Sequence, residues 1–535
     1  MLVITIWVLE VIQEFTDIVK TVYKGARKGS GPVVFMNDDL RKTNAYHLFV
    51  NNFCSSCPLG EHCAPLITII NQHKSRCLDE ATISPFHHCF LCLGILHEYT
   101  EKNFMHQIKK VAEESTTDFE TFRCNLSLPL ILLVRHAYLL KFLQQVSSDY
   151  SDKDIPWVKD QWKNIMVEQL EDIIDKPYQM ESPFELNLDF SYDKEKEEFN
   201  FLRRFRYADD IKKQKSNAQE GFTRTSVLNV LQDITFDDFE KYYKPNVNGK
   251  CICKITAQHE PIYLAGRYNK YSRTLSQTPW IIDGIKKSDT SIEELISIPL
   301  KKFVDAKRKS NNSFKFTLTS VLFIYFLFTE HSFLSSGRED VDVRTLGQGR
   351  PFVIEFRNPK RVLIKPSDIR KLQLKINEST KDIRVRDLQQ ISKVDSSQIK
   401  EGEEDKTKCY LALCYSDTKI DQNELDILST LNNLTIEQKT PIRVLHRRTV
   451  MTRVRIIHTM SAKLIDDYHF QLNLTTGAGT YIKEFVHGDF GRTEPNLQLI
   501  LKRFVDILEL DVLSVNVDFP PSLGEDDDIQ EQQHR

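Results

Sequence analysis

Residues 336–352 read SGREDVDVRTLGQGRPF, and this stretch decides how the C-terminal half of the chain is interpreted. Two arginines and three carboxylates crowd into the seven residues from Arg338 to Arg344, between glycines. A loop that is so highly charged and that leads into an apolar strand, PFVIEF (351–356), suits an active site. Judged on composition alone, a solvated loop of salt bridges explains the pattern equally well.

The segments around this loop predict an α+β fold with a substantial antiparallel sheet. KITAQHEPIYLAGRY (254–268) predicts two strands that meet at a turn, and FQLNL (470–474) alternates as a half-buried strand does. Ser291 and Glu294 form a capping box that predicts the start of a helix. GAGTYIKEFV (477–486) predicts a second helix, with Thr480 as a plausible N-cap.

The length of 535 residues predicts two or three domains. We expect an atypical leader at 1–40, an accessory domain at 41–250, a main domain at 251–522 and an acidic tail at 523–535. The apolar N-terminus lacks the basic start of a signal peptide. The apolar run 316–328 has 13 residues, whereas about 20 are needed to cross a bilayer. We therefore expect no membrane span, and interpret this run as a buried segment or as an insertion from a faulty gene model.

Four of the eleven cysteines form two CxxC pairs, Cys54 with Cys57 and Cys89 with Cys92. Each pair presents two sulfurs from one tight turn, and four thiolates suit tetrahedral zinc. We therefore expect a zinc site that is structural, because it leaves no open position for catalysis. Four unrelated buried cysteines are the alternative. A redox role is disfavoured, because no βαβ context surrounds either pair.

GRYNKYSRTLSQTPW (266–280) interleaves three cations, Arg267, Lys270 and Arg273, with two tyrosines and a tryptophan. Cations for phosphates and aromatic faces for bases are what RNA recognition requires. The segment is therefore a candidate RNA contact, and an ordinary strand and loop is the alternative.

The segment 439–463 holds seven Lys or Arg residues and no Asp or Glu, although the net charge of the whole chain is −3. A local basic strand–turn–strand can lie along an RNA backbone. We expect Arg447 and Arg448 to contact RNA there, and a solvated basic hairpin is the alternative.

Several of these motifs together resemble one family. GRED followed by VDVR resembles the motif that carries the single catalytic aspartate of pseudouridine synthases, and GTYIK (479–483) resembles the motif whose basic residue pairs with it. With GRYNKYSR, QTPW, RPF, RVLHRR and FVHGDFGRT, the chain is similar to the archaeal and eukaryotic Pus ten type. The resemblance is dense over 251–520. It reaches the N-terminal half through the CxxC pairs, which resemble that family's zinc-bearing, THUMP-containing domain.

The resemblance implies a fold and a reaction. The fold is a mixed, largely antiparallel catalytic domain preceded by a zinc-bearing α/β THUMP-type RNA-binding domain. The reaction is the isomerisation of uridine to pseudouridine in tRNA, at positions fifty-four and fifty-five of the TΨC arm. Asp340 is then the nucleophile, Tyr410 stacks on the target base, and Lys483 pairs with Asp340. Further substrate contacts are expected from Ile482, Leu510, Arg338 and Arg344.

The reaction needs no organic cofactor, and the sequence contains neither a P-loop nor a dinucleotide-binding glycine motif. We expect tRNA as the partner, a monomer, and an intracellular location in the nucleus, the cytoplasm or both. A THUMP-bearing tRNA methyltransferase or thiolase is one alternative, but the glycine loops that it needs are not found. The other alternative is a non-catalytic RNA-binding factor in microRNA precursor processing.

Overall fold

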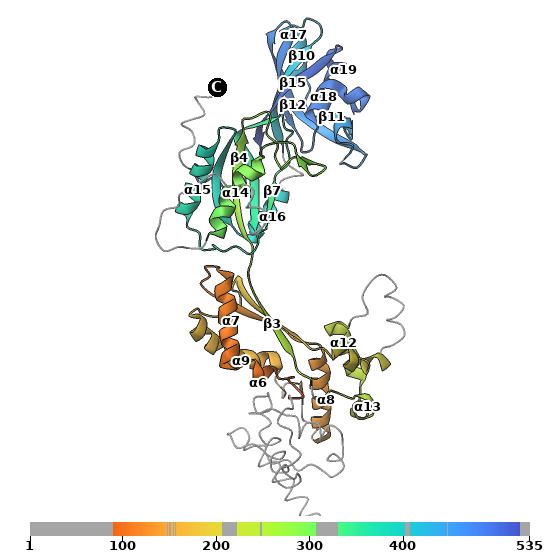
Figure 1. Cartoon of the computed structure of the whole chain (residues 1–535). Helices are drawn as coiled ribbons and strands as arrows, with labels where there is room; N and C mark the ends of the chain where they lie inside the picture. The colour runs from red at the N-terminus through yellow and green to blue at the C-terminus, as the bar shows by residue number, and fades with distance from the viewer. Residues whose placement is uncertain are drawn as a thin grey trace, which may run out of the picture. The chain divides into compact units, whose positions relative to one another are not determined.

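The computed structural model describes residues 89–146, 148, 151–152, 155, 157–205, 222–246, 249–306, 330–401, 407–446 and 448–524. The chain forms two compact units, the first comprising Met1–Thr116 and Glu120–Gln258 and the second Thr117–Phe119 and His259–Arg535 (Figure 1). Residues 251–258 therefore belong to the first unit, whereas we had assigned them to the main domain. Several expectations fall outside the described residues: those for 1–40, Cys54, Cys57, 316–328, Arg447 and 525–535.

The first unit is built on a three-stranded sheet in the order β1-β2-β3. β1 (Arg123–Ser127) and β2 (Phe184–Ser191) are parallel, so the chain must cross over between them, and it does so through two long helices. The burial of β2 alternates at its start, with Phe184, Leu186 and Leu188 facing the core. The remaining elements are β3 (Ile252–His259), α6 (Ile95–Glu98), α7 (Lys102–Ser115), α8 (Ile131–Val146), α9 (Val158–Ile174), α10 (Glu195–Glu198), η3 (Leu202–Arg204), α12 (Arg224–Asp233) and α13 (Phe236–Tyr242).

The second unit is built on a sheet with ten strands among the described residues, in the order β14-β11-β12-β13-β10-β15-β8-β4-β9, with β7 also paired to β8. Every pair is antiparallel except β15 with β8, which is parallel. The expected mixed, largely antiparallel sheet is thus confirmed. Its strands are β4 (Ile262–Lys270), β7 (His331–Ser335), β8 (Arg344–Phe356), β9 (Ile383–Ile391), β10 (Lys408–Ser416), β11 (Leu434–Lys439), β12 (Thr452–Asp466), β13 (His469–Thr476), β14 (Thr493–Glu494) and β15 (Val505–Val515).

Helices cover this sheet and close two hydrophobic cores, and alternate residues of β4 and β8 contribute to one core or the other. α14 (Ile292–Asp305) and α15 (Pro366–Ser379) contribute apolar faces to the core beside β4 and β9 (Figure 1). α18 (Ile482–His487) and α19 (Leu497–Leu501) contribute to the core beneath β10, β13 and β15. In the part of the chain described, no helix is both long and apolar enough to span a bilayer.

Most of the local sequence predictions are confirmed. β3 and β4 form as the two predicted strands, although they belong to different sheets and do not pair with each other. The Ser291 hydroxyl caps α14 by accepting from the Glu294 N–H at 3.2 Å. The basic segment 439–463 is only in part the predicted strand–turn–strand: it holds the last residue of β11, then η6 (Ile442–Val444), and then most of β12, which pairs antiparallel with β11. The predicted N-cap of α18 is wrong: the helix is preceded by Tyr481, and the Thr480 hydroxyl instead donates to the Gly477 carbonyl at 2.8 Å.

Candidate active site

Asp340 lies in the loop between β7 and β8, at the point where the sheet changes from antiparallel to parallel pairing. The first residue of β8, Arg344, stands opposite Asp511 of β15 in the parallel pair. Only two residue pairs join these strands, at Arg344 and Thr345, so the loop that precedes β8 emerges at the edge of this pairing. This places a short charged loop where residues from several strands converge.

The loop is anchored from below by Glu339, whose side chain is fully buried. The Tyr268 hydroxyl lies 2.8 and 3.0 Å from the two carboxylate oxygens of Glu339. Arg350 Nε forms an ion pair with Glu339 Oε2 at 2.7 Å, although its N–H does not point at that oxygen as a hydrogen bond requires. The Gln277 amide donates both to the Tyr268 hydroxyl and to the Gly337 carbonyl. Removing one partner of a buried pair typically costs about 3–5 kcal/mol, so this cluster fixes the loop strongly.

Gly337 is required by the same packing. Its φ is +90°, and a Cβ there would lie 2.8 Å from Arg350 Nη1 and 2.9 Å from Lys408 Nζ. Any side chain would therefore be strained in its backbone and would displace the cations beneath the loop.

Two of the predicted RNA contacts, Arg267 and Lys270, prove to be internal, which corrects that prediction. β4 is buried over its whole length, and Lys270 donates from Nζ to the carbonyls of Asp340 at 3.0 Å and Val341 at 2.6 Å. Burial lowers the pKa of Lys270 to about 8, opposed by nearby carboxylates that include Glu339. Lys270 thus supports the backbone that carries Asp340.

Arg267 is buried in the same strand, and burial lowers its pKa. Its guanidinium donates only to backbone carbonyls, of which those of Gln348, Val517 and Phe519 lie at 2.9–3.0 Å. Arg267 thus connects the end of β15 to β4, and its guanidinium is buried and not available to a ligand.

Arg273 and Arg344 share one carboxylate. Arg344 donates to both oxygens of Asp511, at 2.9 and 2.5 Å, and Arg273 lies 2.8 Å from the same residue and 2.6 Å from Glu509. Both guanidinium groups are therefore already paired with carboxylates, which disfavours Arg344 as one of the expected substrate contacts. Arg338, on the same loop as Asp340, is exposed.

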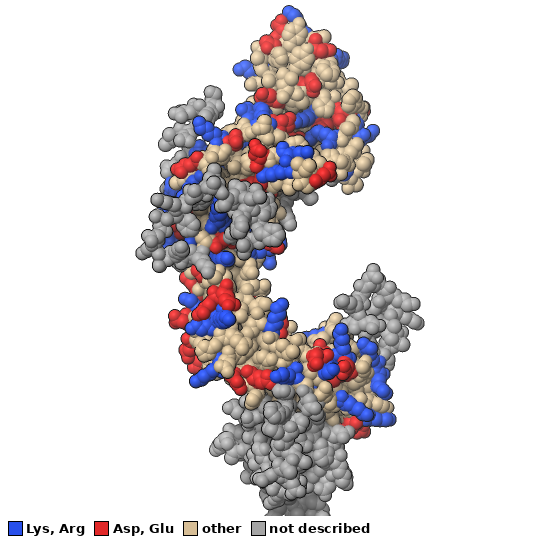
Figure 2. All heavy atoms as spheres, in the orientation of Figure 1, with Lys and Arg blue, Asp and Glu red and all other residues tan. Residues whose placement is uncertain are grey.

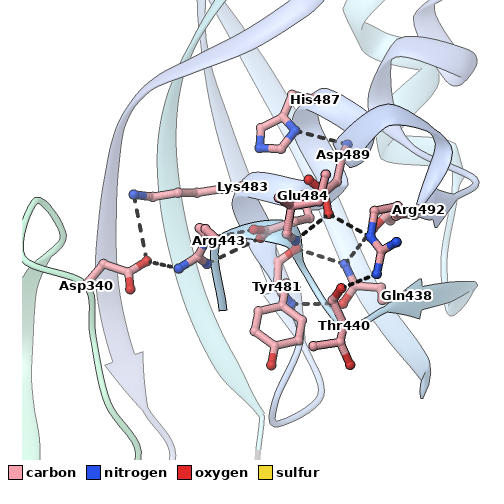
Figure 3. Close-up of polar contacts among 12 residues, drawn as sticks. Asp340, Gln438, Thr440, Arg443, Tyr481, Lys483, Glu484, His487, Asp489 and Arg492 are labelled. Carbon is pink, nitrogen blue, oxygen red and sulfur yellow. Dashed lines mark hydrogen bonds and ion pairs between the residues drawn. The ribbon is translucent and has the colours of Figure 1, made fainter. Parts of the chain in front are cut away.

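The carboxylate of Asp340 meets two cations that arrive from distant parts of the chain (Figure 3). Arg443 Nη1 donates to Asp340 Oδ2 at 2.7 Å, and Lys483 Nζ lies 3.8 Å from the same oxygen. Lys483 is closer to Asp342, at 2.6 and 2.8 Å. Burial would raise the pKa of Asp342, but Lys483 outweighs it and the net shift is downward. The structure brings Lys483 to Asp340, as predicted, but as the more distant of two cations.

The closer cation, Arg443, was not predicted from the sequence. It lies in η6 (Ile442–Val444) and also donates from Nε to Glu484 at 2.7 Å, so it bridges Asp340 and a carboxylate of α18 that is 1% exposed (Figure 3). Burial disfavours the charge on Arg443, but Glu484 and Asp340 outweigh it and raise its pKa. The signal was present in RVLHRR (443–448), but charge density alone did not show which arginine faces Asp340.

Tyr410 lies in β10, half-buried between β13 and β15, with Leu474 and Val512 as its backbone partners. Burial raises the pKa of the phenol, opposed by Arg350, so the ring is neutral at neutral pH. Ile482 and Leu510 are buried in the adjoining core. They support the site from within.

A left-handed turn follows α18 directly. Gly488, Asp489, Phe490 and Gly491 all have positive φ, of 77°, 47°, 57° and 79°. A left-handed conformation costs a residue with a side chain roughly 1–2 kcal/mol, so Asp489 and Phe490 are strained. The buried Asp489 carboxylate accepts from the Ile442 N–H at 3.2 Å, which fastens the turn to η6.

Basic and acidic side chains are interspersed over the visible face of each unit (Figure 2). Arg448 is exposed just after η6. No uniformly basic face is visible, so any attraction for a polyanion must be local.

Cys89 and Cys92 lie on one tight turn of the first unit and are both buried. The Leu93 N–H donates to the Cys89 carbonyl at 2.8 Å, and Leu93 and Gly94 have positive φ. This compact turn fits the half of a zinc site that a CxxC pair supplies. Among the described residues no group of three metal-ligating side chains is gathered, and the two other predicted ligands lie outside those residues.

Comparison with known proteins identifies relatives for both units. Residues 263–310 and 301–516 match the family "Pus10, C-terminal", and residues 89–257 match "Eukaryotic Pus10, N-terminal". The tRNA pseudouridine synthase Pus10 of Homo sapiens is 42% identical over 445 residues, covering 82% of this chain and 80% of that protein. The same-named protein of Xenopus laevis is 42% identical over 466 residues, covering 86% of each. That of Pyrococcus furiosus is 36% identical over 263 residues, covering 49% of this chain and 59% of its own.

If Arg267 is structural, Arg267→Met should lower the free energy of unfolding by about 3 kcal/mol or more, because several buried carbonyls lose their donor. Lys371→Met, which removes an exposed cation from α15, is the matched control and should have little effect. Urea unfolding measures both. Equal stabilities of the two variants would mean that Arg267 does not tie β15 to β4.

Proposed function

The chain belongs to the Pus10 family and is an isomerase of the pseudouridine synthase type, and on that premise we propose that it converts uridine to pseudouridine in tRNA, at positions fifty-four and fifty-five of the TΨC arm. The observation that carries the proposal is the carboxylate of Asp340, held by Arg443 and Lys483 on a loop anchored by buried Glu339. The relatives named as tRNA pseudouridine synthases support tRNA as the substrate.

The chemistry requires an ionised carboxylate at a fixed position. The bond between N1 of uracil and C1′ breaks, the base rotates, and a bond forms between C5 and C1′, after which C5 loses its proton and N1 is protonated. Asp340 acts either as the nucleophile that attacks C1′ or as the base that removes the C2′ proton when a glycal forms. Arg443 and Lys483 orient the carboxylate, and Lys270 and Glu339 hold the backbone that carries it.

The target base must leave its stack to reach Asp340, as for other enzymes that modify bases. Tyr410 supplies a neutral ring, set firmly in β10, on which the flipped uracil stacks. Ile482 and Leu510 line the core behind this position. Arg338 and Arg448, both exposed, supply charge for the RNA backbone.

The first unit is proposed to carry a structural zinc ion held by Cys54, Cys57, Cys89 and Cys92, and to grip the tRNA as a THUMP-type domain. The zinc would stabilise the fold of this unit and take no part in the reaction. We further propose that the protein is a monomer in the nucleus, the cytoplasm or both. The alternative, a role in microRNA precursor processing without catalysis, would be unaffected by loss of the Asp340 carboxylate.

Asp340→Asn is nearly isosteric but neutral, so tRNA affinity should survive while turnover falls at least about 10³-fold. Pseudouridine formed on unmodified tRNA transcripts, mapped by carbodiimide primer extension, measures turnover. Glu378→Gln, which neutralises an exposed carboxylate of α15, is the control and should retain most of the activity. A loss of less than about tenfold in Asp340→Asn, or about 1.4 kcal/mol, would remove Asp340 from the role of nucleophile.

The two cations should differ in their effect on turnover. Arg443 lies closer to the Asp340 carboxylate than Lys483 does, so its charge interacts with that carboxylate more strongly. We expect Arg443→Met to lower turnover more than Lys483→Met does. Because Glu484 is buried and would lose its partner, Arg443→Met is combined with Glu484→Gln.

Single-turnover rates with saturating tRNA compare these variants, and tRNA affinity is measured on the same preparations. Unchanged rates in both variants, with only affinity reduced, would make Arg443 and Lys483 ordinary RNA contacts.

Removing a zinc ligand should unfold the first unit, because binding of structural zinc is coupled to folding. We expect about one zinc ion per chain in the wild type, and loss of the zinc and a lower melting temperature in Cys89→Ser. Cys124→Ser, which replaces a buried cysteine of β1 outside the CxxC pairs, should keep its zinc. Elemental analysis that finds no zinc in the wild type would refute the site.

A further inference from the structure

Phe490 is 97% exposed, more than any other large hydrophobic side chain in the part of the chain described. An exposed phenylalanine leaves its apolar surface in water and gains no packing energy. Single exposed hydrophobic residues are common on protein surfaces, so exposure alone does not assign a role. The backbone at this position gives the second observation.

Phe490 lies on a turn whose left-handed backbone is held in place by neighbouring contacts. The four left-handed residues Gly488–Gly491 include two with side chains, Asp489 and Phe490. The turn is held by contacts at its other positions: the Asp489 N–H donates to His487 Nδ1 at 3.1 Å, and a Cβ at Gly488 would lie 2.7 Å from the Asn496 amide nitrogen. A strained backbone conformation persists only where contacts with the surrounding structure fix it, and such conformations are concentrated at functional sites.

The turn is joined directly to the elements of the active site. It follows α18, which carries Lys483, and the Asp489 carboxylate accepts from Ile442, the residue before Arg443. Figure 3 shows Asp489 and Glu484 on the same side of the cluster, with Arg443 reaching from it to Asp340. The position of Phe490 is therefore coupled to the groups that meet the reacting nucleotide.

The turn is joined to a basic segment of the chain. The Lys439 N–H donates to the Arg492 carbonyl at 2.9 Å, which ties the turn to the start of the segment 439–463, and that segment has seven Lys or Arg residues and no Asp or Glu. An aromatic face next to a basic segment suits a nucleobase, whose phosphate the cations attract. A protein partner with an apolar surface would have no need of this charge.

We propose that Phe490 stacks on an unpaired base of the substrate RNA, next to the nucleotide that is flipped toward Asp340. This inference rests on the proposed function, because it takes RNA as the substrate. Extrusion of a base leaves a neighbouring base with one face uncovered, and a fixed aromatic ring replaces the lost stacking partner without reading its identity. Phe490 is thus a positioning residue for the RNA, separate from Tyr410, which stacks on the target base itself.

The test uses two substitutions at Phe490 in the full chain. Phe490→Asn removes the ring and suits the left-handed backbone, because asparagine tolerates that conformation, so the fold should be as stable as in the wild type or more so. Phe490→Tyr keeps the ring. Ile465→Asn replaces an exposed apolar residue at the far end of β12 and is the matched control.

We expect Phe490→Asn to weaken the affinity for a tRNA transcript about tenfold, because one stacked base is lost. KM should rise by a similar factor with kcat nearly unchanged, since the ring binds substrate and transition state alike. The slope of log affinity against log salt should stay constant, whereas loss of a phosphate contact reduces it by about one. Phe490→Tyr and Ile465→Asn should behave as the wild type does.

Wild-type affinity and KM in Phe490→Asn would overturn the inference and leave the proposed function intact. So would a change in sedimentation with unchanged RNA affinity, because the ring would then contact protein. A smaller slope of log affinity against log salt concentration in Phe490→Asn would also count against stacking. If the wild type forms no pseudouridine, the proposed function fails, while the affinity measurements still decide whether Phe490 contacts RNA.

Discussion

The buried carboxylate of Glu339 is the constraint on which the site depends. An ionised carboxylate away from water is tolerated only when it is paired and hydrogen-bonded, and here Arg350 and Tyr268 meet that demand. Each comes from a different strand of the sheet, β8 and β4. The pairing of Glu339 with Arg350 and Tyr268 therefore links β8 and β4 to the loop and positions the adjacent Asp340.

Above this anchor, charges of opposite sign follow one another across the surface of the site. Asp342 pairs with Lys483, and Arg443 connects Asp340 to the buried Glu484. Each of these carboxylates lies near a cation, so the opposite charges of the cluster largely cancel. This explains why a chain with a net charge of −3 can still present a charged, reactive centre.

The cations of the second unit have distinct roles that their residue types do not reveal. Arg267 and Lys270 donate to backbone carbonyls from inside the sheet, and Arg273 and Arg344 converge on Asp511. Only burial separates them from exposed residues such as Arg338. Two of the three cations that suggested RNA binding in 266–280 thus hold the protein together, and the third, Arg273, is paired with carboxylates. The basic segment 439–463 divides similarly, because Arg443 faces the site and Arg448 faces solvent.

The sequence by itself determined the periodic elements and the location of the chemistry. Alternation and capping are local properties, so β13 and the start of α14 followed from their own residues, and GRED and GTYIK indicated Asp340 and Lys483 through resemblance. Only the tertiary structure decided the cation nearest to Asp340, because Arg443 is 103 residues away along the chain. It alone also showed that Arg267 and Lys270 are internal, since a strand buried on both faces can bury cations when carbonyls and carboxylates surround them. The left-handed turn that displays Phe490 depends likewise on Asp489 reaching η6. Contacts between residues distant in sequence determine which charges are buried, paired or free to meet a ligand, and no local pattern encodes them.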